Sequence, residues 1–244
     1  MLNLEILKLK YNIDVKNIAH IGAHNGKEVK VYKKLFPNSK IYLFEPNKLS
    51  FQKLLNSFKN EKNVYLYNIA LGNKNENKTM NISTDFPNTS SLLKPRLHKD
   101  YYPDVIFDSK ELVQIKRFDS LNIKNINFMS IDTQGFELEV LKGSIEHLAF
   151  VDYVIVEINR KPLYDNSPLQ KDIDKFLIQH NFIRVVTSYW GKECVWGDGF
   201  YIRKNKISKV LMFRSYLKII LYKNIFFYKF IRFIKLKIKN FKRK

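Results

Sequence analysis

Two apolar runs on either side of a small-residue turn constrain the fold of this chain most strongly. The first run, Ile18–Ile21, leads into a turn that ends at Gly26, and the second, Ile41–Phe44, ends at Glu45. Gly26 and Glu45 lie 19 positions apart, which is the distance that one helix and a returning parallel strand require. In such a unit a ligand approaches the backbone at the turn, and the acid accepts hydrogen bonds from ribose hydroxyls. The spacing therefore predicts a nucleoside cofactor.

Apolar runs alternate with helical patterns over most of the chain. Continuously apolar strands that are separated by helices indicate a mainly parallel sheet covered on both faces. The last two runs have no helix between them, so we expect them to pair antiparallel. The prediction is an α/β, Rossmann-like fold with seven strands and a C-terminal antiparallel hairpin, the layout of class I methyltransferases. The expected strands are Ile18–Ile21, Ile41–Phe44, Val64–Ile69, Ile126–Ile131, Tyr153–Ile158, Phe182–Val186 and Phe200–Ile202.

The length of 244 residues fits one α/β domain with a remainder. We expect the domain over residues 1–204 and a basic tail over residues 205–244. The stretch of about 73–116 breaks the alternation and is rich in Asn, Ser, Lys and Asp. We interpret it as an insertion that carries one or two short strands and covers the substrate.

The turn itself bears on which cofactor is bound. Gly22 is followed by Ala23, and the second glycine that a dinucleotide pyrophosphate needs for close approach is absent. S-adenosylmethionine has no pyrophosphate, so this turn favours it over NAD. The alternatives are that the glycines serve packing and that Glu45 favours the dipole of the next helix.

Further candidate residues follow the other predicted strands. Asn68 and Ala70 end the third strand, where they could frame an adenine. Asp132 directly follows the fourth strand and could hold the amino group of the cofactor or take a proton from a substrate hydroxyl. Its alternative role is a helix N-cap. Glu137 in the next helix and Glu157 at the end of the fifth strand are candidates for orienting the acceptor.

Histidine and cysteine usage adds little chemistry. His24 and His98 are possible bases, but a lone histidine is more often a packing or surface residue. The five histidines show no metal-binding spacing, so we predict no metal site. The single Cys194 and an N-terminus without a signal-peptide pattern fit a cytoplasmic protein.

With these segments in hand, the chain resembles the FkbM family of S-adenosylmethionine-dependent methyltransferases. The resemblance implies the class I fold and O-methylation of hydroxyls on sugars, polyketides and related metabolites. It also implies that Gly22, Ala23 and Gly26 form the cofactor turn, that Glu45 binds the ribose and that Asp132 lies at the methyl-transfer site. The matching segments are 21–26, 44–46, 70–72, 90–93, 117–121, 131–143 and 156–158.

Some residues in these segments receive weaker assignments. His20 stands where many members of the family have an acid, which bears on how the methionine end of the cofactor is held. We include His20 and Asn25 among the expected cofactor-binding residues. Ser90 and Ser91, in a segment that matches the family, are candidate substrate contacts.

The tail carries most of the basic charge. The chain has a net charge of +20, and residues 206–244 hold 13 Lys or Arg and no acid. A membrane span is not expected, because the 25 residues from Val210 to Ile234 include five cations. An amphipathic basic helix on an anionic membrane surface fits better. The alternatives are a tail that packs on the domain or on another subunit, and an RNA-binding arm, although nucleic acid is not the favoured partner.

These observations together predict an S-adenosylmethionine-dependent O-methyltransferase. Its acceptor would be a hydroxyl of a sugar, a glycan precursor or a related small molecule, which could be lipid-linked and reached from the inner face of a membrane. The alternatives are a nicotinamide-dependent oxidoreductase and a non-catalytic membrane- or nucleic-acid-binding module that uses the basic tail.

Overall fold

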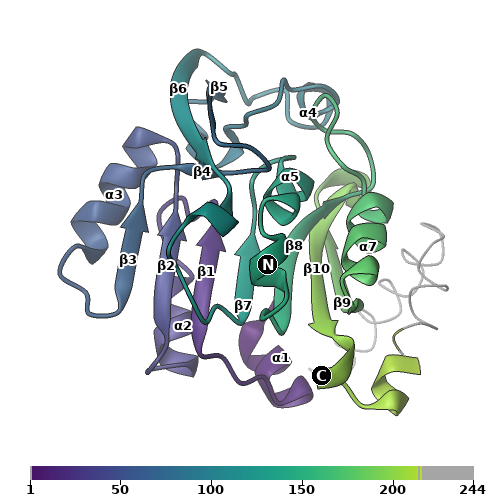
Figure 1. Ribbon diagram of the computed structural model, residues 1–244. Helices are drawn as coiled ribbons and strands as arrows, with labels where there is room; N and C mark the ends of the chain where they lie inside the picture. Colours follow the sequence, from purple (N-terminus) through teal and green to yellow (C-terminus); the bar gives the residue numbers. More distant parts are fainter. Residues whose placement is uncertain (1, 214, 216–244) are drawn as a thin grey trace, which may run out of the picture.

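A seven-stranded sheet forms the centre of the computed structural model, which describes residues 2–213 and 215 (Figure 1). The strand order is β3-β2-β1-β7-β8-β10-β9, and β10 runs in the direction opposite to the other six strands. The predicted parallel sheet with a late antiparallel hairpin is therefore confirmed. The bounds are β1 Asn17–Ile21, β2 Lys40–Phe44, β3 Val64–Tyr67, β7 Phe128–Ile131, β8 Tyr153–Asn159, β9 Phe182–Trp190 and β10 Trp196–Arg203.

Alternate residues of the strands point to opposite faces, and helices cover both. On β1, Ile18 packs with the helices of one face, whereas Ala19 and Ile21 pack with those of the other. Helices α1 Leu4–Tyr11, α2 Val29–Leu35 and α3 Lys48–Phe58 cover the first face, and α5 Glu137–Lys142, α6 Ile145–Leu148 and α7 Gln170–Gln179 cover the second.

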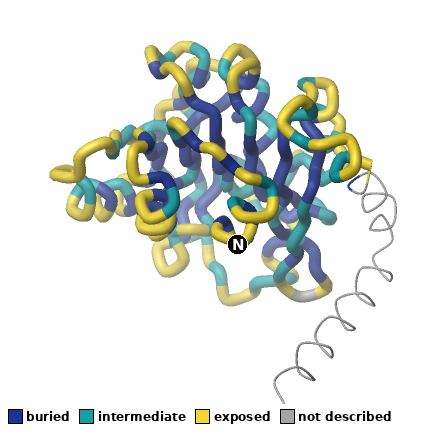
Figure 2. The backbone as a smooth tube through the Cα atoms, turned by 90° about the horizontal axis from the view of Figure 1, so that it is seen from below, coloured by how far each residue is buried: buried dark blue, intermediate teal, exposed yellow. Residues whose placement is uncertain are grey.

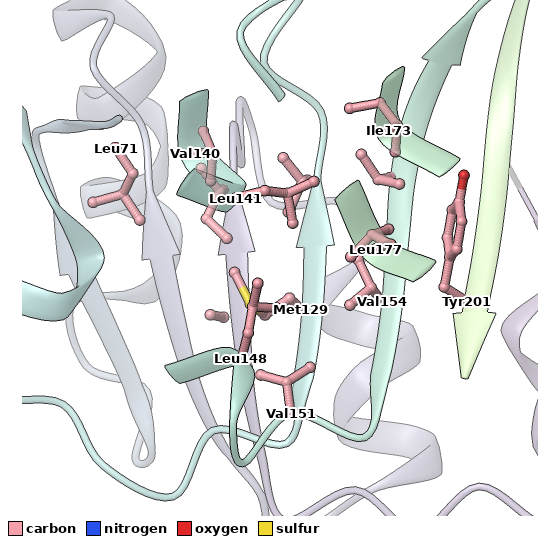
Figure 3. Packing of buried hydrophobic residues seen from close by; sticks show 14 of the residues in the cluster. Leu71, Met129, Val140, Leu141, Leu148, Val151, Val154, Ile173, Leu177 and Tyr201 are labelled. Carbon is pink, nitrogen blue, oxygen red and sulfur yellow. The ribbon is translucent and has the colours of Figure 1, made fainter. Parts of the chain in front are cut away.

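The sheet is buried between these two helical layers, as Figure 2 shows by the run of dark blue through the centre of the chain. On the second face, Met129 and Val154 of the sheet lie among Val140, Leu148 and Leu177 of the covering helices (Figure 3). This packing fixes the strand ends relative to one another, and those ends carry the polar residues of interest.

A smaller sheet lies above the carboxyl ends of the parallel strands (Figure 1). Its order is β4-β6-β5, with bounds β4 Ala70–Leu71, β5 Glu76–Ile82 and β6 Ser109–Lys116. The predicted run Val64–Ile69 is thus split, because the chain turns at Asn68 and leaves the main sheet for the small one. The short helices of the chain are η1 Pro87–Thr89, α4 His98–Tyr101, η2 Phe118–Ser120, η3 Lys192–Cys194 and η4 Lys204–Lys206.

Helix beginnings differ from the sequence expectations. Asn25 followed three residues later by Glu28 is a sequence pattern that predicts a helix start of the capping-box type. The structure shows this prediction to be wrong, because the Asn25 side chain accepts a hydrogen bond from Lys27 N and the helix begins only at Val29. Asn3, by contrast, caps helix α1 by accepting from Ile6 N. The pattern of Leu4 and Leu7 after an Asn was the available signal for this helix, which we did not predict.

The expected amphipathic helix of the basic tail falls largely on residues 214 and 216–244, outside the described residues. Within the described part of the chain, no helix is long and apolar enough to cross a membrane.

Candidate active site

A pocket of about 230 Å³ opens at the carboxyl ends of β1, β2, β7 and β8, and the small sheet contributes Ala70, Leu71 and Met80 to its lining. Open α/β sheets bind ligands at this edge. The structure brings most of the predicted site residues to this pocket, and the expected residues in its lining are His20, Gly22, Ala23, Asn25, Glu45, Ala70, Ser90, Asp132 and Glu157. Four other expected residues, Gly26, Asn68, Ser91 and Glu137, are not in its lining.

The turn after β1 is built on left-handed backbone. Gly22 has φ +79°, and its amide donates to the carbonyl oxygen of Phe44 at 2.9 Å. Gly26 has φ +68° and packs against Phe58 and Leu54 of helix α3, so its place is beside the pocket. Glycine is favoured at both positions, because residues with a side chain rarely adopt a positive φ.

Glu45, at the end of β2, is buried but not unpaired. Its carboxylate accepts from His24 N at 2.7 Å and from Asn47 N at 2.9 Å. Burial nevertheless raises its pKa to about 7. Asn68 supports this corner from behind by donating to the backbone carbonyl oxygens of Glu45 and Pro46. The arrangement holds the Glu45 carboxylate at the pocket wall.

Two carboxylates from neighbouring strands are joined by one amide. Gln134 Nε2 lies 2.8 Å from Asp132 Oδ1 and 2.9 Å from Glu157 Oε2. Because an amide nitrogen has two hydrogens, it can donate one to each carboxylate. Burial raises the pKa of Glu157 well above its usual range, and the charge of Asp132 raises it further. Of the two side chains, Glu157 is therefore the one whose surroundings favour the protonated form.

The same glutamine is tied to the segment that covers the pocket. Tyr164 Oη lies 2.9 Å from Gln134 Oε1 and 3.0 Å from the carbonyl oxygen of Thr89. Ser91 Oγ donates to the backbone carbonyl oxygen of Gln134 at 2.6 Å. Ser91 thus anchors the covering segment, whereas its neighbour Ser90 lines the pocket. We define residues 83–93 as the covering segment.

Glu137 is fully buried beneath the loop that follows β7. Its Oε1 accepts from Thr133 N, Thr133 Oγ1 and Gly135 N at 3.0–3.1 Å. Burial raises its pKa to about 7. The structure places this side chain where it shapes the loop, and not where a substrate enters.

The three histidines considered at the sequence level are all poor cations here. Burial lowers the pKa of His20 to about 4 and that of His98 to about 4, and it also lowers the pKa of His24. His98 packs against Tyr164, Tyr102 and Phe107, away from the pocket lining. His24 lines the pocket, and its Nε2 has no hydrogen-bond partner among the described residues.

The pocket lining is strongly acidic. Five carboxylic side chains face it, and Lys27 is the one Lys or Arg that does so among the described residues. The lining also contains four residues that were not among the expected site residues: Glu28, Gln134, Trp196 and Asp198. Gln134 lies two residues after Asp132 in a motif that we had recognised, whereas Trp196 and Asp198 belong to β10 and to no recognised motif. Within the described residues, no group of His, Cys, Asp and Glu could hold a metal ion.

These residues fit S-adenosylmethionine by their chemistry. The acid at the end of β2 suits a ribose diol, and the acidic lining suits a ligand that carries a sulfonium and an ammonium. The turn at Gly22 and Ala23 brings the backbone close to the ligand, and S-adenosylmethionine has no pyrophosphate that would require a second glycine there.

Comparison with known proteins agrees with this assignment. Residues 20–184 match the methyltransferase FkbM domain family. The chain is 23% identical over 168 residues to the 2-O-methyltransferase NoeI of Sinorhizobium fredii, over 64% of this chain and 69% of that protein. It is 24% identical over 158 residues to Methyltransferase 1 of Beauveria bassiana, over 58% of this chain and 64% of that protein.

A solved structure shares the fold. The methyltransferase FkbM from Methylobacillus flagellatus KT matches with a TM-score of 0.53 and 14% identity, over 77% of this chain and 43% of that chain. The chain described here therefore spans less than half the length of that protein. The sheet and its pocket define the class: an S-adenosylmethionine-dependent methyltransferase with a Rossmann-like fold. The chain belongs to the FkbM methyltransferase family, so S-adenosylmethionine is its methyl donor and the nicotinamide alternative is set aside.

Proposed function

We propose that the chain methylates a hydroxyl group of a sugar, a glycan precursor or a related small molecule. The observation that carries the proposal is the pair of carboxylates, Asp132 and Glu157, held at the pocket by Gln134. The name of the distant relative NoeI, a 2-O-methyltransferase, supports an oxygen acceptor.

In the proposed reaction, bound S-adenosylmethionine supplies an electrophilic methyl group on a sulfonium that is already a good leaving group. The protein has then to position an acceptor oxygen in line and to remove its proton. Asp132 is the residue we assign to take that proton, because burial and the neighbouring charge of Asp132 favour the protonated form of Glu157. A C–O bond forms as the C–S bond breaks, and the hydroxyl proton passes to an Asp132 oxygen.

The remaining expected residues receive binding roles in this proposal. Glu45 accepts the ribose hydroxyls. The backbone around Gly22 and Ala23 contacts the donor, and Ala70 borders the adenine. Asn68 acts indirectly, by donating to the backbone carbonyl oxygens of Glu45 and Pro46. The other expected donor-site residues are His20, Asn25 and Gly26, of which Gly26 acts through the shape of the turn.

We place the acceptor between the carboxylates and the covering segment. Ser90 and Asn88 of that segment line the pocket together with Trp196 of β10. Hydroxyl and amide groups beside an aromatic ring suit a hydroxyl-rich, partly apolar molecule such as a sugar. The acidic lining disfavours an acceptor that brings a phosphate or carboxylate into the pocket. Glu157 is assigned here to orientation of the acceptor.

The test is transfer of tritium from S-adenosyl-[methyl-³H]methionine to a panel of methyl hexosides and deoxyhexosides and, in parallel, to a set of amines and carboxylic acids. Sugar-bound tritium that survives alkali indicates a methyl ether, whereas release by alkali indicates an ester. We expect an alkali-stable product with the wild type and little with Asp132→Asn. Donor binding without transfer to any hydroxyl compound of the panel, but with transfer to amines or carboxylates, would refute the proposed acceptor class.

We also propose that residues 1–204 form the catalytic unit, with residues 73–116 over the acceptor, and that residues 205–244 hold it on an anionic membrane surface near lipid-linked acceptors. The support is the charge pattern of the tail. We expect the full chain to sediment with vesicles of phosphatidylcholine and phosphatidylserine but not with phosphatidylcholine alone. Replacement of six tail cations by Gln should abolish this, at Arg214, Lys218, Lys229, Arg232, Lys235 and Lys239.

The matched control for the tail variant replaces six exposed lysines of the domain. If both variants lose vesicle binding equally, general charge is responsible and the tail assignment is wrong. The control positions are Lys30, Lys40, Lys59, Lys62, Lys74 and Lys99.

A further inference from the structure

Glu28 is a nearly buried carboxylate that faces the cofactor pocket. It immediately precedes helix α2, and its side chain is 10% exposed. No donor from another described residue forms a hydrogen bond with this carboxylate. The nearest described cation is Lys27, whose Nζ is 3.9 Å from Glu28 Oε1 and whose side chain is 74% exposed. Burying a carboxylate with so little compensation is costly unless a ligand provides it.

The surroundings of Glu28 select for a positive ligand. A second cavity, beneath the N-terminal segment of α1, adjoins the cofactor pocket, and Glu28 lines both. The other residues that line both cavities are His20, Asp132 and Asp198. His20 is uncharged at neutral pH, so three carboxylates meet there with no cation among the shared residues.

The order of the strands indicates which end of the donor reaches this place. Glu45 follows β2, and Ala70 lies to one side of it, where we place the adenine. The junction with Glu28 lies to the other side, toward β7 and β10, which carry Asp132 and Asp198. S-adenosylmethionine is linear, with its ribose between the adenine and the amino acid. If the ribose is at Glu45, the amino acid extends toward Glu28.

We propose that Glu28 binds the α-ammonium group of S-adenosylmethionine and of its product. The proposal rests on the assignment of this pocket to the donor. An ammonium has three hydrogens to donate, and it would give the Glu28 carboxylate a closer charged partner than Lys27, the cation that the described residues supply. Asp198 does not serve equally well, because its Oδ2 already accepts from Leu2 N at 3.0 Å.

The test compares ligands that differ in the amino-acid end. S-adenosylhomocysteine carries the ammonium, its deaminated 2-oxo analogue lacks it, and 5′-methylthioadenosine lacks the whole amino acid. Calorimetry on the full chain would measure each affinity for the wild type, Glu28→Gln, Glu45→Ala and Glu61→Gln. Glu61→Gln is the matched control, because it removes the same charge at an exposed position paired with Lys33. Thermal melting would confirm that each variant is folded.

We expect Glu28→Gln to weaken S-adenosylhomocysteine by about tenfold or more, as for a lost charged hydrogen bond. Binding of 5′-methylthioadenosine and of the deaminated analogue should change by less than about twofold. Glu45→Ala should weaken all three ligands, and Glu61→Gln none. Equal losses for all ligands in Glu28→Gln, or no loss for S-adenosylhomocysteine, would overturn the proposal. Failure of the wild type to bind S-adenosylhomocysteine would instead overturn the donor site itself.

Discussion

The backbone carbonyl oxygen of Asp132 occupies the space that a side chain on Gly22 would need. A Cβ built on Gly22 would lie 1.8 Å from that oxygen. The two residues end neighbouring parallel strands, and Asp132 N donates to Ile21 O at 3.0 Å. The cofactor turn and the proposed base are therefore positioned by direct backbone contact.

Gly22→Ala should disrupt the cofactor turn and the position of Asp132 at once. It adds a backbone collision to a left-handed φ, so we expect a loss of about 3 kcal/mol or more in the free energy of unfolding. Urea denaturation followed by circular dichroism measures this. In Gly26→Ala the new Cβ meets the ends of the Phe58 and Leu54 side chains, 2.6 and 2.8 Å away. Because those side chains can move, a smaller loss is expected. Equal stabilities of Gly22→Ala and the wild type would show that the strand ends can separate.

Asp132→Asn should reduce kcat by about a hundredfold or more, as expected for loss of a general base. Glu157→Gln should reduce it by less than about tenfold, because a protonated acid is closer to an amide. Initial rates of tritium transfer to the best acceptor of the sugar panel measure both. S-adenosylhomocysteine affinity, measured in parallel, separates catalysis from folding. If Glu157→Gln were the more damaging change, the base assignment would move to Glu157.

Gln134→Glu replaces the shared donor by a third carboxylate. It removes both hydrogen bonds to Asp132 and Glu157 and adds negative charge, which disfavours ionisation of the pair. We expect kcat to fall about tenfold or more and the acidic limb of its pH profile to move to higher pH. Gln52→Glu, on the exposed face of α3, is the control. A reduced kcat with an unmoved pH profile would indicate a merely steric role for Gln134.

Glu137→Gln should stabilise the protein more at higher pH. Its pKa rises from an ordinary 4.5 to about 7 in the folded state, so the native state binds more protons and loses stability as pH rises through this interval. A Gln can keep its oxygen at the position of Oε1 and place its amide where Oε2 has no partner. The variant's advantage should grow by roughly 1–3 kcal/mol between pH 5 and 8.

Urea unfolding at constant ionic strength measures that difference, with Glu61→Gln as an exposed control. A difference between Glu137→Gln and the wild type that stays constant with pH would show that Glu137 remains ionised throughout.

The sheet could be predicted from the sequence because its strands are continuously apolar. The apolar runs Tyr153–Ile158 and Ile126–Ile131 predict strands that are buried on both faces. The lack of a helix between the last two apolar runs predicts that those two strands pair antiparallel. Strand lengths at the edge were less predictable. β9 extends to Trp190, four residues beyond the expected Val186, and the prediction stopped short because the half-buried polar residues Thr187 and Ser188 interrupt the apolar pattern before the buried Tyr189.

The site residues that could be predicted are likewise those that lie next to a local sequence pattern. Glu45 and Asp132 were expected because each ends an apolar strand next to a recognisable motif. Glu28, Trp196 and Asp198 were missed because they reach the pocket through tertiary packing of α2 and β10, which no local pattern reports. The helix start predicted at Asn25 was wrong because an Asn four residues before a helix can close a local turn as readily as it can cap the helix.

The tie between the covering segment and Gln134 constrains how acceptor preference can be changed. Thr89 and Ser91 reach Gln134 through Tyr164 and through a direct hydrogen bond. A segment transplanted from another family member would therefore retune proton removal as well as selectivity. We expect a grafted segment to change the acceptor without loss of turnover only if it keeps a hydroxyl at position 91 and places the backbone carbonyl oxygen of position 89 within reach of Tyr164.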